Sequence, residues 1–289
     1  MGSIAWRVAL FMLLAFAGAC PPLQAALPER IRAQVETSML VSGYVGIATD
    51  GTTSGVQLDQ RDALPPGIVK LVERAAGTWR FEPVRVDGVV SAVRTRMQLR
   101  VVAKQTGEDA YTISLRGATF GGQDGTAPSE VRATVMTPPR YPKRALRMGM
   151  QGEVYLVVRV GRDGRVQDAL SEQVNLFVYG RPAEMDAGRK LLSDAALLAA
   201  RDWTFQPPSE GPAVDAPYWS VRIPVAFMFA DSPRTVPPGV GEWKTYLPGP
   251  RTSAPWADAG EGNEGSDAIA EGRLQMAGVG PRLLTPLEG

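Results

Sequence analysis

The sequence lacks histidine altogether and contains a single cysteine, Cys20, in 289 residues. Without an imidazole there can be no Ser-His or Cys-His nucleophile pair, no histidine general base and no histidine-containing zinc site. One cysteine also excludes a disulfide within the chain. Neither a Ser-x-x-Lys motif nor a clear pair of isolated acids takes their place. We therefore predict that the protein is not an enzyme and uses no metal or cofactor, which leaves a hydrolase as the most distant alternative.

The chain also lacks an excess of charge of either sign, with 31 Lys and Arg residues against 30 Asp and Glu residues. Binding of a polyanion depends on many cationic groups that displace its counterions. Hydrophobic residues make up 44% of the chain and charged residues 21%, which is ordinary for a protein with a sizeable core. We therefore predict a folded protein without a nucleic-acid partner.

Long hydrophobic runs are missing except at the N-terminus, where Arg7 precedes an apolar stretch from Val8 to Ala19. Pro21-Pro22 and then Leu23-Gln24-Ala25 follow, which is the order of regions in a cleavable signal peptide. The stretch is shorter than the run of about 20 apolar residues that a bilayer-spanning helix needs. We therefore predict that residues 1–25 are a signal peptide and that the mature protein is in the periplasm.

Cys20 leaves a second interpretation open, because it follows Ala17-Gly18-Ala19 as a lipoprotein cysteine would. Acylation of Cys20 would attach the mature chain to a membrane through a lipid. A third interpretation is an uncleaved N-terminus that anchors the chain in the inner membrane. The mass of the mature N-terminus distinguishes the three.

A strand, a hairpin turn, a second strand, a helix, an aromatic pair and a last strand follow one another after residue 150. Alternating apolar residues predict the strands, an Asp-Gly pair predicts the turn, and apolar residues at helical spacing predict the helix. The elements are, in order, Gly152–Val160, Gly161–Gly164, Arg165–Ala169, Met185–Asp202, Trp203-Thr204-Phe205-Gln206-Pro207 and Trp219–Phe229. The apolar stripe of the helix contains Leu191, Leu192, Ala195, Ala196, Leu198 and Ala199.

The same order occurs earlier in a weaker form, which indicates an internal repeat. Its elements are Tyr44–Thr49, the turn Asp50-Gly51, Val56–Leu58, the helix Ile68–Ala76, Trp79-Arg80-Phe81-Glu82-Pro83 and the strand Val93–Val102. On that last strand, Arg94, Arg96, Gln98 and Arg100 share one face. We predict that this face is solvated, and an anion site is the alternative.

The repeat divides the chain into two modules, at residues 40–120 and 138–230, joined by a Gly-rich linker at 121–128. After residue 230 the chain is rich in Pro, Gly and acidic residues, and residues 231–289 are predicted to form a largely disordered tail. Trp243, Tyr246 and Trp256 are unusual in such a tail. Two interpretations stay open for them, namely packing against the modules and contact with a partner.

The second module contains further features in a fixed order: Pro139-Arg140-Tyr141-Pro142, Arg144-Ala145, Gly149, Gly152, Asp163–Val166 and Trp203–Pro207. In this order and spacing they resemble the TonB C-terminal domain family over residues 138–230. The module at 40–120 is similar to a degenerate copy without the Tyr-Pro entry. The resemblance implies an α+β fold with two TonB C-terminal-like modules, each a small antiparallel sheet packed against a helix, plus the largely disordered tail.

The resemblance also implies a protein or peptide partner. In the family, an energy transducer of the inner membrane pairs with the N-terminal TonB box of outer-membrane transporters by strand addition, in which an extended peptide completes the unpaired N–H and C=O groups of a sheet edge. The residues implied as partner-binding are Arg140, Tyr141, Pro142, Ser220, Val221, Arg222, Ile223 and Val225. Pro224 suits an edge strand because it cannot donate a ladder hydrogen bond. For Tyr141, Trp203 and Phe205, packing within the fold is the simpler expectation.

The chain departs from the family's transducers in three respects: it has no histidine, its apolar N-terminus is short, and no long Pro-rich spacer precedes the first module. We therefore predict a periplasmic TonB-like protein that binds an envelope partner, such as an outer-membrane TonB-dependent transporter, by β-strand addition. Two alternatives stay open. One is a membrane-anchored energy transducer for outer-membrane transport, and the other is a structural module that forms a homodimer through its last strand.

Overall fold

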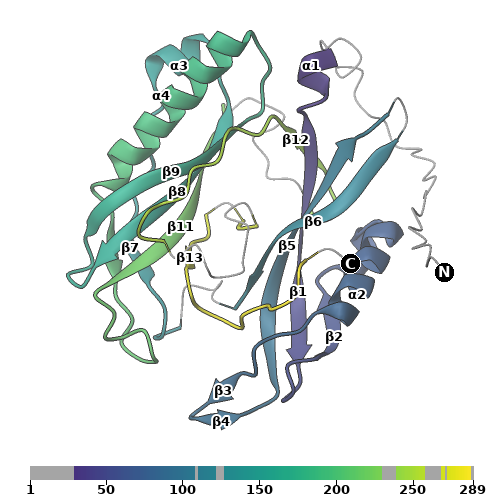
Figure 1. The fold of residues 1–289 in the computed structure, drawn as a ribbon. Helices are drawn as coiled ribbons and strands as arrows, with labels where there is room; N and C mark the ends of the chain where they lie inside the picture. Colours follow the sequence, from purple (N-terminus) through teal and green to yellow (C-terminus); the bar gives the residue numbers. More distant parts are fainter. Residues whose placement is uncertain are drawn as a thin grey trace, which may run out of the picture.

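The structure is a computed structural model that describes residues 29–107, 110–121, 127–229, 239–257, 268–270 and 272–287. Two antiparallel sheets, each with a helix against one face, account for most of it (Figure 1). The predicted α+β fold is therefore confirmed, and we call the two sheet-and-helix parts the first and second units. The predicted signal peptide lies outside the described residues. None of the helices in the described ranges is both long and apolar enough to span a membrane.

The first unit is a five-stranded sheet in the order β12-β1-β5-β6, with β2 also paired to β1. Its strands are β1 (Glu36–Ile47), β2 (Thr53–Leu58), β5 (Val93–Gln105), β6 (Tyr111–Phe120) and β12 (Lys244–Tyr246). Next to them are the short helix α1 (Glu29–Arg32), a 3-10 turn (Arg61–Ala63) and a hairpin of β3 (Arg85–Val86) and β4 (Val89–Val90). The helix α2 (Pro66–Thr78) begins at a proline, whose fixed φ suits the first helical position, and ends where Trp79 adopts extended backbone.

The second unit is a four-stranded sheet in the order β13-β11-β8-β9. Its strands are β8 (Gly152–Gly161), β9 (Val166–Leu176), β11 (Tyr218–Phe227) and β13 (Gln275–Met276), and a separate ladder joins β7 (Arg132–Val135) to β10 (Thr204–Gln206). The short helix α3 (Lys143–Arg147) precedes β8, and α4 (Pro182–Ala200) covers one face of the sheet (Figure 1).

The helix α4 starts with a cap from the Glu184 side chain and packs through a stripe of mostly small residues. The Glu184 carboxylate accepts a hydrogen bond from the Arg181 backbone N–H at 3.2 Å, which satisfies a donor that the helix start leaves open. The buried stripe consists of Met185, Gly188, Leu192, Ala196 and Ala200. Leu198, which the sequence placed in the stripe, is 65% exposed. Gly188 lets α4 lie close to Met150, because a Cβ there would lie 2.5 Å from Met150 Sδ.

Each sheet buries one face under its helix and turns the other toward the second sheet (Figure 1). In β8, the side chains of Val154, Leu156, Val158 and Val160 belong to the core under α4. Successive strand residues alternate between faces, so Glu153 and Tyr155 lie on the face without a helix. In the first unit, Ser38 and Arg100 lie on the corresponding face, away from the core under α2.

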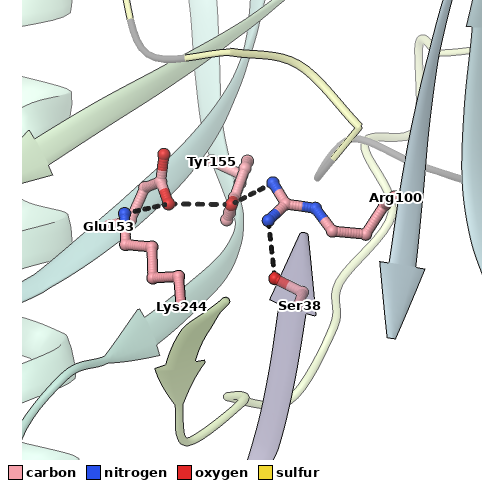
Figure 2. A network of polar contacts seen from close by, with 5 residues as sticks. All are labelled: Ser38, Arg100, Glu153, Tyr155 and Lys244. Atoms are coloured by element: carbon pink, nitrogen blue, oxygen red, sulfur yellow. Dashed lines mark hydrogen bonds and ion pairs between the residues drawn. The ribbon is translucent and has the colours of Figure 1, made fainter. Parts of the chain in front are cut away.

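Five residues connect these two faces in one polar network (Figure 2). Arg100 Nη1 donates to Ser38 Oγ at 2.8 Å, and its Nη2 donates to Tyr155 Oη of the second unit at 3.3 Å. Tyr155 Oη donates to Glu153 Oε2 at 2.9 Å, and Lys244 Nζ lies 3.5 Å from the same oxygen. The two units thus share buried hydrogen bonds.

The arginines of β5 are not on one uniform solvated face. Arg94 is exposed, and Arg94 and Arg96 lie over the ring of Tyr44 at 3.9 and 4.7 Å from its centroid. Arg100 is 5% exposed, because the second unit and Lys244 cover that end of the strand. The prediction of a solvated face is therefore wrong for Arg100, since a strand pattern does not reveal what another unit will cover.

The described parts of the tail, residues 239–257, 268–270 and 272–287, contact both units. β12 pairs with β1, and Leu247 exchanges two backbone hydrogen bonds with Leu176 of β9, at 2.8 and 3.0 Å. Tyr246 is buried and donates to Glu36 Oε2 at 3.1 Å. Trp243 packs against the first core, and the Trp256 carbonyl accepts a hydrogen bond from Tyr218 Oη at 3.2 Å. All three tail aromatics thus contact the chain itself.

Candidate functional site

The strand β11 is the last strand of the second unit before the tail. It pairs with β8 along its whole length, from Tyr218 opposite Gly161 to Phe227 opposite Gly152. In an antiparallel ladder the N–H and C=O of one residue point the same way. The Ser220 carbonyl points away from β8, because it accepts a hydrogen bond from the Ala277 N–H at 2.8 Å.

The outward-facing backbone groups of β11 therefore belong to every second residue from Ser220 onward. We call this set the β11 edge; it consists of Ser220, Arg222, Pro224 and Ala226. Pro224 falls on an outward position, where its missing N–H costs no bond to β8. A proline in this strand is thereby explained, and it also removes one donor from the edge.

Three of the residues that the sequence assigned to partner binding have their side chains in the core. Val221, Ile223 and Val225 are 0%, 2% and 7% exposed and lie in the cluster under α4. Their backbone groups face β8. Ser220 is 9% exposed, and its carbonyl belongs to the β11 edge. The groups that β11 presents at its edge are thus mainly backbone N–H and C=O groups.

Part of the β11 edge is already paired with the chain's own C-terminal region. In β13, Met276 lies opposite Val221 and Gln275 lies opposite Arg222. Leu274, Gln275 and Met276 are 9%, 7% and 4% exposed. Among the described residues, no strand pairs with the outer side of residues 223–227. The outward groups left over are the carbonyl of Pro224 and both groups of Ala226.

The Tyr-Pro segment before α3 reaches the other end of the same strand. The Tyr141 ring lies 5.6 Å from that of Phe227, edge to face, and 5.3 Å from that of Phe229. Its hydroxyl donates to the Met150 carbonyl. Burial raises the pKa of Tyr141 to about 12, so the phenol stays protonated and remains a donor at neutral pH. Tyr141 therefore positions the end of β11.

The two neighbours of Tyr141 have different surroundings. Pro142 is half-buried and caps the start of α3. Arg140 is exposed to solvent beside Tyr141. The structure thus brings the Tyr-Pro segment and β11 together through Tyr141, while Arg140 is a surface residue.

Charged groups lie beside the β11 edge on the face without a helix. Arg222 Nε lies 3.5 Å from Glu172 Oε2 of β9, and Arg251 Nη2 of the tail lies 3.9 Å from Glu172 Oε1. The Glu172 side chain is 5% exposed. The positive charge of Arg222 is therefore partly balanced within the unit, and the edge has no strong field of one sign.

Sequence reasoning missed the C-terminal residues that pair with this edge. The signal was a short alternation, Leu274-Gln275-Met276, placed between Gly272 and Gly278. Both glycines have positive φ, at +74° and +75°. Two turn residues around an apolar–polar–apolar triplet are typical of a minimal strand, but the surrounding composition favoured disorder.

A cavity of about 230 Å³ lies between the two units, close to the network of Figure 2. Its lining includes both signs of charge, from Arg100, Glu153, Glu242 and Lys244. In the ranges that the structure describes, no cluster of three or more Cys, Asp or Glu side chains could hold a metal ion. The cavity therefore offers no evident site for a metal.

The sequence profile of one family, Gram-negative bacterial TonB protein C-terminal, matches residues 137–171. Two curated relatives called Protein TonB, from two strains of Xanthomonas campestris pv. campestris, are each 35% identical to the chain over 98 residues. That stretch is 34% of this chain, and the chain spans 38% of the length of each relative. No solved structure matches the chain.

The matched residues include the Tyr141-Pro142 segment, β8 and the Asp163-Gly164 turn that leads into β9. The elements that follow, α4, the Trp203-x-Phe205 pair and β11, occur in the order that the resemblance implied. The second unit of this chain is therefore similar to the TonB C-terminal domain family in its sequence and in the order of its elements.

Proposed function

We propose that this chain is a periplasmic TonB-like protein, not an enzyme, that binds an envelope partner by strand addition at the β11 edge. The partner is an extended peptide segment, such as the TonB box of an outer-membrane transporter. The observation that carries the proposal is β13, because the edge of β11 already accepts a short antiparallel segment there. The periplasmic location rests on residues 1–25 being cleaved, which the mass of the mature N-terminus tests.

The chemistry of this edge favours an extended peptide over a folded surface. Its available groups are backbone N–H and C=O, and each hydrogen bond made by them contributes only about 1 kcal/mol. Affinity must therefore accumulate over several ladder bonds, and selectivity must come from side chains on the two faces of the added strand. Tyr141 supports this use of the edge, since it packs against Phe227 and fixes the end of the strand.

The proposal is tested with a matched pair of substitutions at Ala226, whose N–H faces outward. Ala226→Pro removes this donor, whereas Ala226→Val keeps it and adds bulk of similar size. We expect Ala226→Pro to weaken binding of a fluorescent TonB-box peptide about fivefold, which corresponds to about 1 kcal/mol for one lost hydrogen bond, and Ala226→Val to leave the affinity near that of the unmodified chain. Fluorescence anisotropy measures the affinity, and circular dichroism checks that both variants fold.

Equal affinity of the two variants would contradict strand addition at this edge. Failure of the unmodified chain to bind the peptide at all would contradict the proposed partner class. A chain that instead elutes as a dimer, and becomes monomeric only in Ala226→Pro, would favour the structural alternative, in which a second copy occupies the edge.

A further inference from the structure

The residues that pair with the β11 edge have the character of a bound peptide. We propose that Leu274–Ala277 is the chain's own occupant of this edge, and that the edge takes antiparallel segments with an apolar–polar–apolar pattern in competition with it. This inference rests on the proposed function of the β11 edge. It goes further by naming the sequence pattern that a partner must have and the segment that it must displace.

The pattern follows from where the occupant's side chains lie. Met276 is directly opposite Val221, and side chains of directly opposed residues lie on the same face of a sheet. Leu274 and Met276 both belong to the cluster under α4. Gln275 lies opposite Arg222 on the other face. An added strand therefore fills two apolar positions, two residues apart, that the second unit would otherwise expose.

A guest and the occupant compete because both need the same outward backbone groups of β11. A guest that pairs along the whole β11 edge needs the outward groups of Ser220 and Arg222, and the occupant uses them. Farther along, Pro224 has no N–H to offer. A guest that leaves the occupant in place is limited to the Pro224 carbonyl and Ala226. A full ladder is therefore possible only after the occupant has left.

The occupant can detach from β11 without unfolding the second unit, because few contacts hold it. It is paired at two residues, whereas β8 pairs with β11 at ten. Gly272 and Gly278, both at positive φ, bound it on either side. Short segments with few ladder bonds open at lower free energy than the core strands beside them. Beyond it, Leu284 N–H donates to the Arg80 carbonyl of the first unit at 2.7 Å, so the freed segment remains tethered nearby.

The test uses the full chain and a labelled peptide with the sequence of residues 272–279 as the probe. In the unmodified chain the tethered occupant competes at high effective concentration, so the probe binds weakly. The double substitution Leu274→Ser with Met276→Ser removes the two apolar anchors, and we expect the probe to bind about tenfold more tightly or better. Leu284→Ser is the control, because Leu284 is 56% exposed in the same segment, and it should match the unmodified chain.

The same probe with its own Leu and Met replaced by Ser should not bind the double variant. Equal binding of the unsubstituted probe to the unmodified chain and the double variant, or binding to neither, overturns the proposal. A double variant that binds the TonB-box peptide but not the probe overturns it as well. A double variant that binds the probe but no TonB-box peptide upholds the occupant and refutes the proposed partner class instead.

Hydrogen exchange of the unmodified chain tests the occupant without any substitution. The Ala277 N–H, which donates to Ser220, should exchange at least about 100-fold faster than the Val221 and Ile223 N–H groups that face β8. Equal protection of these amides would mean that the occupant opens only with the whole unit, which overturns the proposal.

Discussion

The two units hold an aromatic residue against the same kind of turn. In the first unit, the Phe81 N–H donates to the Gly51 carbonyl at 2.8 Å; in the second, the Phe205 N–H donates to the Gly164 carbonyl at 2.8 Å. Each glycine ends an Asp-Gly turn between the first two strands. The contact links a local hairpin to the aromatic segment that follows the helix, so both units repeat one arrangement.

The units differ in which part of the chain lies beside the aromatic pair. In the second unit it is β7, which precedes the unit and pairs with β10. In the first unit it is the C-terminal region, where Leu283 lies opposite Phe81 in an antiparallel bridge. The Glu82 N–H also donates to the Arg282 carbonyl at 2.9 Å. The unit that comes first in the sequence is therefore completed by the last described part of the chain.

This difference in the flanking segment shows that the C-terminal region is part of the fold of both units. The same C-terminal stretch places β13 on β11 of the second unit and Leu283 in the core of the first. A contact between such distant residues forms only after the intervening chain has closed a long loop. The second unit has its flanking strand close by in sequence, and the first unit depends on the far end of the chain.

Substitution of the turn glycines is expected to have the largest effect and tests the likeness of the units. Gly51→Ala and Gly164→Ala would each place a Cβ 2.1 Å from a phenylalanine carbonyl, at φ +80° and +74°. We expect each to lower the free energy of unfolding by about 3 kcal/mol. Gly88→Ala is the control, because Gly88 has φ +80° but no atom within 4 Å of the added Cβ.

The control should cost about 1 kcal/mol, the strain of a left-handed alanine alone. Urea denaturation of the three variants measures the differences. If Gly51→Ala cost no more than Gly88→Ala, the turn of the first unit would not be held as that of the second is, and the comparison would fail.

Truncation of Leu283 tests the difference between the units. Leu283 is 4% exposed in the first core, so Leu283→Ala is expected to lower the free energy of unfolding by about 2–3 kcal/mol. Leu284→Ala changes the next residue, which is 56% exposed, and should cost less than about 0.5 kcal/mol. Urea denaturation measures both. Equal losses would show that the C-terminal region does not complete the first unit.

The two units also differ in the hydrogen bonding of the tryptophan in the Trp-x-Phe pair. Trp203 Nε1 donates to the Thr137 carbonyl at 2.9 Å, just after β7. The buried Nε1 of Trp79 has no hydrogen-bond partner among the described residues. Trp203→Phe should therefore lower the free energy of unfolding by about 1–2 kcal/mol more than Trp79→Phe does, as measured by urea denaturation. Equal losses would mean that the bond to Thr137 contributes nothing.

Local patterns were enough to predict the repeated part of the fold. The turn glycines, the two helices and the Trp-x-Phe pairs each depend on residues within a few positions of one another, and the structure places them as expected. The strand β11 was also visible from its alternation. The edge of the candidate site followed from these elements, because a last strand in a small sheet has an outer side.

What the sequence did not reveal depends on contacts between distant residues. β12 and β13 are three and two residues long, too short for a periodic pattern, and take their conformation from β1 and β11. Arg100 is buried because the other unit covers it. For the same reason the occupant of the β11 edge could not be predicted, since its partner strand lies in a different part of the chain.

The Tyr141-Pro142 segment of the second unit has no counterpart in the first unit. Its substitution is expected to have the smallest effect on the free energy of unfolding, and the most pH-dependent one. Tyr141→Phe removes the hydrogen bond to the Met150 carbonyl and should lower the free energy of unfolding by about 1 kcal/mol at pH 8. Burial raises the pKa of Tyr141 from 10.0 to about 12 in the folded chain. Between these values the unfolded chain loses a proton that the folded chain keeps, so the contribution of Tyr141 is complete below pH 10 and is lost toward pH 12.

The gap between the unmodified chain and Tyr141→Phe should therefore narrow as pH rises from 8 to 11, because only the unmodified chain has this phenol to ionise. Taking the difference between the two proteins cancels the other tyrosines, which both contain. Urea denaturation at several pH values measures it. A gap that stays constant would mean that Tyr141 ionises alike in both states, and that its place against Phe227 does not shield it from water.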